Sequence, residues 1–355
     1  MTMQASSLLL KNKTVFPGWS PAWQKNKVFS GEVVFNTGMT GYVESLTDPS
    51  YTNQILVFTY PLIGNYGVPG PRRWESKKIH VSGVVVGSAV ETWNHYEGRG
   101  SLTSWLQSQQ VPLITGVDTR ALTRILRGHG TMPGAIVSHA KGAPRLPIFN
   151  DEIGTDLMKA VSIKRPRIYG SGPKKIIVVD CGMKENIIRS LLRFPVTIKR
   201  VPYDYDYTRE SFDGLFVSNG PGDPADCRAT IEILQKALSL KNPRPIFGIC
   251  LGSQLLAIAA GAKTYKLPFG HRGHNQPCLE LNTGRGVVTS QNHGYAVDEA
   301  SIPVGWQVTY RNLNDGSVEG LAHATQPFFS VQFHPEAAPG PTDTKDLFEK
   351  FFALL

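Results

Sequence analysis

One segment of the chain, Pro245-Ile-Phe-Gly-Ile-Cys250-Leu-Gly-Ser-Gln-Leu-Leu-Ala-Ile-Ala, has the pattern of a buried strand that turns sharply into a helix. Apolar residues lead to Gly248, and helix-forming Leu and Ala follow Gly252. This pattern predicts that Cys250 lies on a strained, exposed turn at the carboxyl end of the strand, an arrangement called a nucleophile elbow. The N–H groups and the dipole at the start of the helix would stabilise negative charge on the sulfur. Cys250 is therefore a candidate nucleophile.

A second apolar run, Phe328-Phe-Ser-Val-Gln-Phe, leads to His334-Pro-Glu336. It predicts another buried strand with His334 at its end. Residues two apart on extended backbone point the same way, and Pro335 stiffens the link. Glu336 can therefore hold the imidazole while its other nitrogen faces the sulfur. The alternative is a buried cysteine with an ordinary surface histidine. A nucleophile candidate and a base candidate, each at the end of a predicted strand, favour catalysis over this alternative.

The C-terminal half alternates apolar strands with helix-length segments, and strands are expected at 175–180, 214–218 and 245–249. This alternation predicts an α/β fold with a doubly wound, mostly parallel sheet, whose active site lies at the carboxyl ends of the strands. The N-terminal half has short alternating strands and Gly-rich turns, with helices expected near 101–109 and 119–127. It is expected to form a smaller, β-rich α+β domain.

A stretch rich in Pro, Gly and charge separates the two halves. A chain of 355 residues also exceeds the usual size of a single core. We therefore expect an N-terminal domain at 1–140, a linker at 141–173 and a C-terminal domain at 174–355.

The formal net charge of +9 raises the question of nucleic-acid binding. Lys and Arg are scattered, however, and no nucleic-acid motif accompanies them, which argues against this class. One basic stripe, Arg120, Arg124 and Arg127, lies on a single face of the predicted helix after the plausible cap Asp118. It is either a solvated helix face or a docking surface for an acidic partner.

No apolar run reaches membrane length, and the first residues lack the basic region of a signal peptide. The four cysteines show no Cys-x-x-Cys spacing, which argues against a disulfide framework and a zinc site and favours the cytoplasm. Asp223 and Asp226 have no third ligand at suitable spacing, so we interpret them as turn and cap residues and expect no metal. His274 and His293 are weaker pocket candidates, and His271 has no partner that the sequence identifies.

Several motifs give the chain a family resemblance. Gly248-Ile-Cys250-Leu-Gly-x-Gln254 followed by His334-Pro-Glu336 resembles the class I (triad) glutamine amidotransferases. Nearly the whole chain is similar to the glutaminase component, or small subunit, of glutamine-dependent carbamoyl phosphate synthetase, closest to the pyrimidine-pathway type. The motifs that carry this similarity are Gly31-Glu-Val-Val-Phe-Asn-Thr-Gly-Met-Thr-Gly-Tyr, Leu46-Thr-Asp-Pro-Ser50-Tyr, Gly116-Val-Asp-Thr-Arg120, Asp180-Cys-Gly-Met-Lys, Phe212-Asp-Gly-Leu-Phe-Val-Ser-Asn-Gly220-Pro-Gly222-Asp-Pro, Gly270-His-Arg-Gly-His-Asn-Gln-Pro-Cys278 and Thr289-Ser-Gln-Asn292-His-Gly294-Tyr295.

The resemblance implies that Cys250 attacks glutamine, His334 moves the proton and Glu336 orients His334, which releases glutamate and ammonia. The expected oxyanion donors are the N–H of Leu251, directly after the nucleophile, and the loop that contains Gly220. The resemblance also implies a glutamine pocket to which both domains contribute: Ser50, Gly220, Gly222, Leu251, Gln254, Asn292, Gly294 and Tyr295. Two residues depart from the family pattern, since most relatives have His at Ser253 and Phe is common at Tyr295, and glutamine affinity could shift.

The chain has neither a Gly-x-x-x-x-Gly-Lys-Ser/Thr loop nor anything that resembles the synthetase's ATP-binding domains. The resemblance therefore implies a partner, either a separate large subunit or fused synthetase domains, that uses ATP, Mg and bicarbonate to convert tunnelled ammonia into carbamoyl phosphate. No cofactor is expected in this chain itself. The alternatives are an amidotransferase or γ-glutamyl hydrolase of another pathway and a non-catalytic regulatory subunit, and the choice between pyrimidine and arginine supply stays open.

Overall fold

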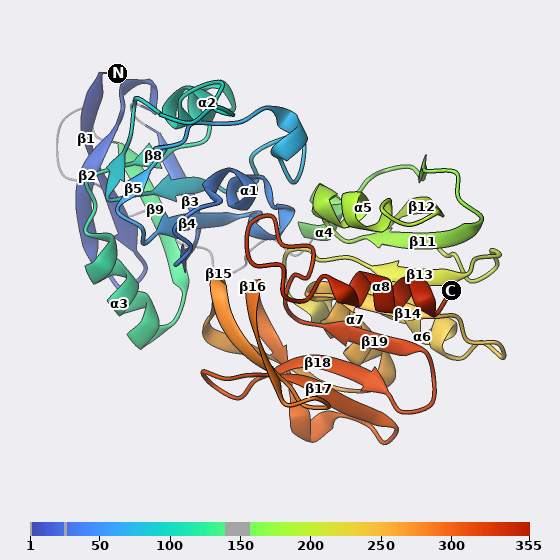
Figure 1. The fold of residues 1–355 in the computed structure, drawn as a ribbon. Helices are drawn as coiled ribbons and strands as arrows, with labels where there is room; N and C mark the ends of the chain where they lie inside the picture. The colour runs from blue at the N-terminus through green and yellow to red at the C-terminus, as the bar shows by residue number, and fades with distance from the viewer. Residues whose placement is uncertain (1, 25–26, 139–156) are drawn as a thin grey trace. The chain divides into compact units, whose positions relative to one another are not determined.

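The computed structural model describes residues 2–24, 27–138 and 157–355 (Figure 1). The chain divides into two compact units, Met1–Thr155 and Asp156–Leu355, and each is described by itself. Part of the expected linker lies outside the described residues. Its described part, 157–173, belongs to the second unit and contains α4 (Leu157–Val161) and β10 (Arg167–Tyr169). No helix among the described residues is both long and apolar enough to span a bilayer.

The first unit is built on a seven-stranded mixed sheet with the strand order β2-β1-β9-β3-β4-β6-β8. The strands β3, β4, β6 and β8 are parallel to one another, whereas β1 and β9 pair antiparallel with their neighbours. The bounds are β1 (Met3–Leu10), β2 (Val15–Pro21), β3 (Val28–Asn36), β4 (Gln54–Phe58), β6 (Gly83–Val85), β8 (Leu113–Ile114) and β9 (Met132–Ser138), with a separate pair β5 (Leu62–Ile63) and β7 (Ser88–Ala89).

Three α-helices accompany this sheet: α1 (Tyr42–Thr47), α2 (Leu102–Ser108) and α3 (Thr119–His129). Ser101 caps α2 by accepting a hydrogen bond from the N–H of Ser104 at 3.2 Å, and Asp118 caps α3 by accepting one from Ala121 at 2.9 Å. These caps satisfy N–H groups that have no partner within the helix, which is why the helices begin there. Both helices and the cap at Asp118 agree with the sequence prediction.

The second unit contains a ten-stranded sheet with the order β10-β12-β11-β13-β14-β19-β18-β17-β15-β16. Its centre, β12-β11-β13-β14-β19, is parallel throughout, as the apolar strands predicted. The remaining strands are antiparallel to their neighbours. The bounds are β11 (Lys174–Asp180), β12 (Val196–Pro202), β13 (Gly214–Val217), β14 (Ile246–Ile249), β15 (Thr264–Glu280), β16 (Arg285–Val297), β17 (Trp306–Asn312), β18 (Val318–His323) and β19 (Phe328–Val331).

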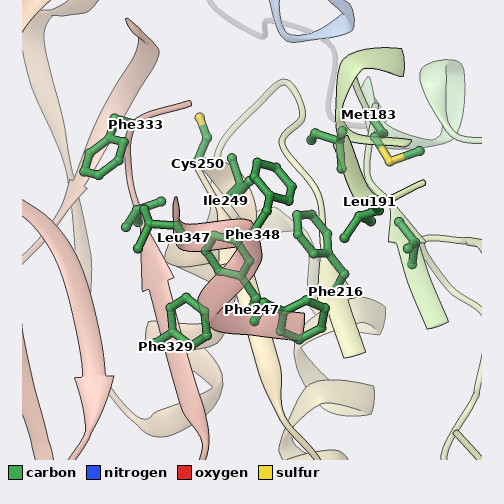
Figure 2. Close-up of a cluster of buried hydrophobic side chains, with 14 of the residues drawn as sticks. Met183, Leu191, Phe216, Phe247, Ile249, Cys250, Phe329, Phe333, Leu347 and Phe348 are labelled. Atoms are coloured by element: carbon green, nitrogen blue, oxygen red, sulfur yellow. The ribbon is translucent and has the colours of Figure 1, made fainter. Parts of the chain in front are cut away.

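Helices cover both faces of the parallel strands, which makes this unit a doubly wound α/β fold. Along β11 the side chains alternate, so that Val178 faces one hydrophobic cluster and Val179 the other. The first cluster includes apolar residues of α5 (Glu185–Leu191) and α8 (Asp346–Ala353), and Figure 2 shows its aromatic centre around Phe247 and Phe348. The second includes residues of α6 (Arg228–Leu238) and α7 (Leu251–Ala260).

The parallel arrangement decides where polar side chains meet. The strands β11, β13, β14 and β19 all end at the same edge of the sheet. The segments that follow them, at 181–184, 218–222, 250 and 332–336, are therefore brought together. In Figure 2, Cys250 stands at the end of its strand with the sulfur pointing away from the aromatic cluster.

Candidate active site

Cys250 occupies the turn between β14 and α7 with φ 55° and ψ −108°, a conformation that residues other than glycine rarely adopt. Its N–H donates to the carbonyl of Val331 at 2.9 Å, which ties the turn to β19. A Cβ on Gly248 would lie 2.6 Å from the carbonyl oxygen of Gly252, and a Cβ on Gly252 would lie 2.2 Å from that of Val217. Only glycine fits at either position, so the two glycines permit the strained elbow.

The cysteine is buried, with 2% of its surface exposed. The expectation of an exposed sulfur was wrong, because segments from other strand ends cover the turn. The thiol donates to the carbonyl oxygen of Asn292 on β16 at 3.6 Å. The nucleophile candidate therefore lies directly against the strand that carries several of the expected glutamine contacts.

His334 and Glu336 lie just beyond β19, and both are buried. The His334 N–H donates to the carbonyl of Ser290, and its ring nitrogen Nδ1 lies 2.7 Å from Oε1 of Glu336. The other ring nitrogen, Nε2, makes no hydrogen bond with the described residues. Burial by itself would lower the pKa of His334, but attraction to Glu336 and to Cys250 raises that pKa to about 10. The imidazole is thus held by the carboxylate on one side and lies within electrostatic reach of the sulfur.

Lys184 is a further member of this array that the sequence analysis did not single out. Its Nζ lies 3.1 Å from Oε1 of Glu336 and donates to the carbonyl of Ala337 at 2.6 Å. Burial by itself would raise the pKa of Glu336, but Lys184 and His334 lower it to about 2. The carboxylate therefore stays ionised at neutral pH. The motif Asp180-Cys-Gly-Met-Lys contained the signal, but nothing in the spacing connects Lys184 with a residue 152 positions later.

The loop after β13 lies against both the elbow and the segment of Lys184. The side chain of Asn219 accepts from the N–H of Lys184 at 3.1 Å and donates to the carbonyl of Gly182 at 3.2 Å. At Gly220, a Cβ would lie 2.0 Å from the carbonyl oxygen of Cys181 and 2.9 Å from the side chain of Leu251. The loop with Gly220 and Gly222 is thus packed beside Leu251, whose N–H belongs to the unpaired first turn of α7.

Gln254 and Tyr295 meet on the other side of the elbow. The amide Nε2 of Gln254 donates to the carbonyl of Tyr295 at 2.8 Å and to Oε1 of Gln332 at 2.9 Å. In this structure Gln254 therefore braces the backbone of β16, which also carries Asn292 and Gly294. Its expected contact with glutamine remains a prediction.

Two of the residues named from the sequence have local roles that the structure defines. Ser253 donates to Ser330 Oγ at 2.8 Å inside the core and so joins α7 to β19. Asp223 accepts from the N–H of Ala225 at 2.9 Å, which confirms its interpretation as a cap. Ser50 lies in the first unit, in a short 3-10 helix capped by Asp48. Its place in a glutamine pocket remains a prediction.

The four cysteines are free thiols buried in the second unit. His271, for which the sequence analysis identified no partner, lies beside two acids, since its Nε2 is 2.9 Å from Asp315 and its Nδ1 is 3.4 Å from Glu319. Both acids lie more than 40 residues away in the sequence, which is why spacing did not reveal them.

The array contains the parts needed for acyl transfer. A thiol stands on a strained turn at the N-terminus of a helix, and a buried imidazole is oriented by an ionised carboxylate. The loop that contains Gly220 brings closely packed backbone beside Leu251. The same chemistry serves hydrolysis of an amide through a thioester.

Comparison with known proteins gives two family matches. Residues 177–354 match "Glutamine amidotransferase class-I", and residues 8–136 match "Carbamoyl-phosphate synthase small chain, CPSase domain". Multifunctional protein CAD of Squalus acanthias is 51% identical over 91% of this chain and 15% of that protein. Multifunctional protein URA2 of Saccharomyces cerevisiae is 44% identical over 97% of this chain and 17% of that protein.

A third relative has a length similar to that of this chain. The carbamoyl phosphate synthase arginine-specific small chain of Candida albicans is 46% identical over 98% of this chain and 84% of that protein. The chain thus spans less than a quarter of the two multifunctional relatives but most of the small chain. The family matches and these identities show that the chain belongs to the carbamoyl phosphate synthase small-chain family, with a class I glutamine amidotransferase domain as its second unit.

Proposed function

We propose that this chain hydrolyses glutamine to glutamate and ammonia and delivers the ammonia to a synthetase that makes carbamoyl phosphate from bicarbonate and ATP. The observation that carries the proposal is the buried set of His334, Glu336 and Lys184 beside a cysteine on a nucleophile elbow. Membership of the small-chain family supports the same reaction.

In the proposed reaction, His334 takes the proton of the Cys250 thiol, and the sulfur attacks the side-chain carbonyl carbon of glutamine. The negative charge moves to the carbonyl oxygen, which accepts hydrogen bonds from the N–H of Leu251 and from the backbone of the Gly220 loop. His334 then protonates the amide nitrogen, the carbon–nitrogen bond breaks and ammonia leaves. A γ-glutamyl thioester remains on Cys250.

The second half of the reaction releases glutamate. His334 takes a proton from a water molecule, and the water oxygen attacks the thioester carbon. The carbon–sulfur bond then breaks, glutamate leaves, and His334 returns the proton to the sulfur, which restores the Cys250 thiol. Glu336 keeps the imidazole in the orientation and tautomer that both steps need, and Lys184 keeps Glu336 ionised. Gly222, Gln254, Asn292, Gly294, Tyr295 and, from the first unit, Ser50 are the proposed contacts for the substrate's amino and carboxylate groups.

The synthetase in this proposal is a large subunit or a set of fused domains. ATP and Mg belong to that partner. The relatives include both arrangements, since two are multifunctional proteins and one is a small chain. A reducing compartment such as the cytoplasm suits the four buried thiols.

Covalent trapping tests the assignment of the nucleophile. The protein is incubated with a glutamine analogue that carries an electrophilic ketone in place of the amide, and the labelled cysteine is found by peptide mass spectrometry. We expect a label at Cys250, competition by glutamine and much slower labelling of His334→Asn. Labelling of Cys181, Cys227 or Cys278 at equal rates, without protection by glutamine, would refute the assignment.

A further inference from the structure

The segment Asn292–Tyr295 of β16 lies at a break in its ladder with β15. Lys266 pairs with Tyr295 and His271 pairs with His293, so that residues 267–270 of β15 face a single residue of β16, Gly294. Such bulges re-aim side chains and remove regular backbone hydrogen bonds. The segment that touches the Cys250 sulfur through the carbonyl of Asn292 is therefore paired with β15 at Asn292, His293 and Tyr295 but not at Gly294, and side chains give it further support.

His293 is one of the side chains that hold this segment. Its Nδ1 lies 2.8 Å from the carbonyl oxygen of Tyr295, the same oxygen that accepts from Gln254. Its Nε2 lies 3.2 Å from Oε1 of Gln291. The orientation of Gln291 is itself fixed, because its Nε2 donates to Oε2 of Glu319 at 3.0 Å. A chain of contacts thus leads from Glu319 to the backbone of Tyr295.

Glu319 lies on β18 with none of its surface exposed. Its Oε1 accepts from Nδ2 of Asn312 at 3.2 Å and lies 3.4 Å from Nδ1 of His271. The carboxylate therefore joins residues of β15, β16, β17 and β18 in one buried cluster. A charge in such a place is costly unless it is paired and hydrogen-bonded, so this carboxylate needs a cationic partner.

The contacts of the two histidines identify that partner. Each of the four ring nitrogens of His271 and His293 lies near an oxygen atom, whereas two neutral imidazoles carry only two N–H groups. Nδ1 of His271 also lies 3.4 Å from Nδ2 of Asn312, but that amide donates to Oε1 of Glu319 at the shorter distance of 3.2 Å. The rings are 4.9 Å apart, which disfavours charging both. His271 lies between Asp315 at 2.9 Å and Glu319 at 3.4 Å, whereas His293 faces a carbonyl and an amide and lies 3.8 Å from Glu319. The additional proton therefore belongs on His271.

The pKa directions of the two histidines agree with this placement. Burial raises the pKa of Glu319 above its usual value, and the contacts with His271 and Asn312 oppose that rise. Burial lowers the pKa of His271, but Glu319 and Asp315 outweigh burial and raise the pKa above its usual value. Burial lowers the pKa of His293, and the neighbouring His271 lowers it further.

We propose that Glu319 and His271 form a buried ion pair that positions the segment Asn292–Tyr295 for glutamine. The pair is a positioning device and does not touch the reacting atoms. This inference rests on the proposed function in one respect, namely that the segment binds glutamine. The existence of the ion pair itself does not depend on that function.

A metal ion is the competing occupant of the cluster. One ligand atom each from His271, His293 and Glu319 lie within 4.8 Å of one another. However, the amide groups of Asn312 and Gln291 donate hydrogens to the two oxygens of Glu319. Each oxygen of Glu319 thus already accepts one amide hydrogen, and a cation would have to share both oxygens with N–H donors, which favours a proton over a metal.

Imidazole nitrogen chemical shifts test the ion pair without reference to activity. The protein is labelled with ¹⁵N-histidine, and His271 is assigned by its disappearance in His271→Gln. At pH 7 we expect both nitrogens of His271 to be protonated in the wild type, and the ring to become neutral in Glu319→Gln. A neutral His271 in the wild type would overturn the pair. Stoichiometric zinc in the purified protein that is lost in Glu319→Gln would also overturn it, in favour of a metal.

Steady-state glutamine kinetics of the intact protein with its synthetase test the positioning role. Loss of a charge-assisted contact predicts that KM for glutamine rises at least about tenfold in Glu319→Gln, while kcat stays within about twofold because the triad is untouched. The matched control is Glu299→Gln, which removes the carboxylate of an exposed pair with Arg311 and should leave KM unchanged. An unchanged KM in a Glu319→Gln protein that has lost the His271 charge would refute the positioning role.

Two further results distinguish failure of the ion-pair proposal from misfolding of a variant and from failure of the proposed function. If Glu319→Gln does not fold, Asp315→Asn removes the half-exposed partner of His271, and it should shift the imidazole and raise KM by a smaller factor. An unchanged His271 spectrum in that variant would contradict the proposal. If the wild type releases no glutamate, the proposed function fails, whereas the ion pair is still decided by the imidazole shifts.

Discussion

Replacement of Lys184 by methionine should lower the unfolding free energy of the second unit by an amount that follows from the contact between Lys184 and Glu336. Glu336 is fully buried, and its pKa falls from 4.5 to about 2 in the folded protein, with Lys184 as the largest lowering influence. At about 1.4 kcal/mol for each pKa unit, the shift corresponds to about 3 kcal/mol of stabilisation. Lys184→Met should remove most of this and also leave the carbonyl of Ala337 without its donor. We expect a loss of roughly 2–4 kcal/mol at pH 7.

The pH dependence of this loss has a definite sign. Because the folded pKa of Glu336 lies below its unfolded value, the carboxylate stabilises the fold above pH 4.5, and this contribution disappears as the pH falls toward about 2. The difference in unfolding free energy between the wild type and Lys184→Met should therefore be largest near neutral pH and should shrink below about pH 5.

The four buried cysteines provide the assay, since all of them lie in the second unit. Thiol labelling across a urea gradient reports the unfolding of this unit alone. The matched control is Lys199→Met, which removes a partly exposed pair with Glu210 and should cost less than about 1 kcal/mol. A Lys184→Met protein within about 0.5 kcal/mol of the wild type at pH 7, or a difference that grows toward acid pH, would refute the electrostatic argument.

Three other predictions concern the triad and the elbow. Cys250→Ser should abolish glutamine hydrolysis, measured as glutamate release, and leave urea unfolding unchanged. His334→Asn should lose about as much activity, and Glu336→Gln should lose less. Equal losses of activity in all three variants would contradict the assigned roles. Gly252→Ala should prevent formation of the elbow, because its Cβ would lie 2.2 Å from a carbonyl oxygen, and unchanged turnover would contradict this. Stability should fall by a few kcal/mol as the pH rises from 6.5 toward about 10, because the raised pKa of His334 makes its charged form stabilising. In His334→Asn the fall should be smaller, because only other groups such as His271, whose pKa is also raised, still contribute. A fall as large as that of the wild type would contradict this.

The sequence predicted best those elements that apolar runs, helix-forming residues and capping residues define within a short segment. Apolar runs predicted β11, β13, β14 and β19, and the switch to Leu and Ala after Gly252 predicted α7. Asp118 before a helical run predicted the cap of α3. These features depend on neighbours within a few residues, so a single sequence contains them.

Features that depend on distant partners were not predictable in the same way. Lys184 reaches Glu336, and His271 reaches Glu319, only because strands far apart in the sequence end or pair side by side. The burial of Cys250 likewise comes from β16, which lies more than 35 residues further on. The strand β10 has three residues and no alternating burial, so its pairing with β12 left no periodic signal within the expected linker.

Steady-state release of glutamate from glutamine, with and without the synthetase and with Cys250→Ser as control, is the most direct test of the proposed reaction. We predict hydrolysis that depends on Cys250 and that the synthetase stimulates. Hydrolysis that persists in Cys250→Ser, or no hydrolysis under either condition, would contradict the proposed role of this chain as the glutaminase of a carbamoyl phosphate synthetase.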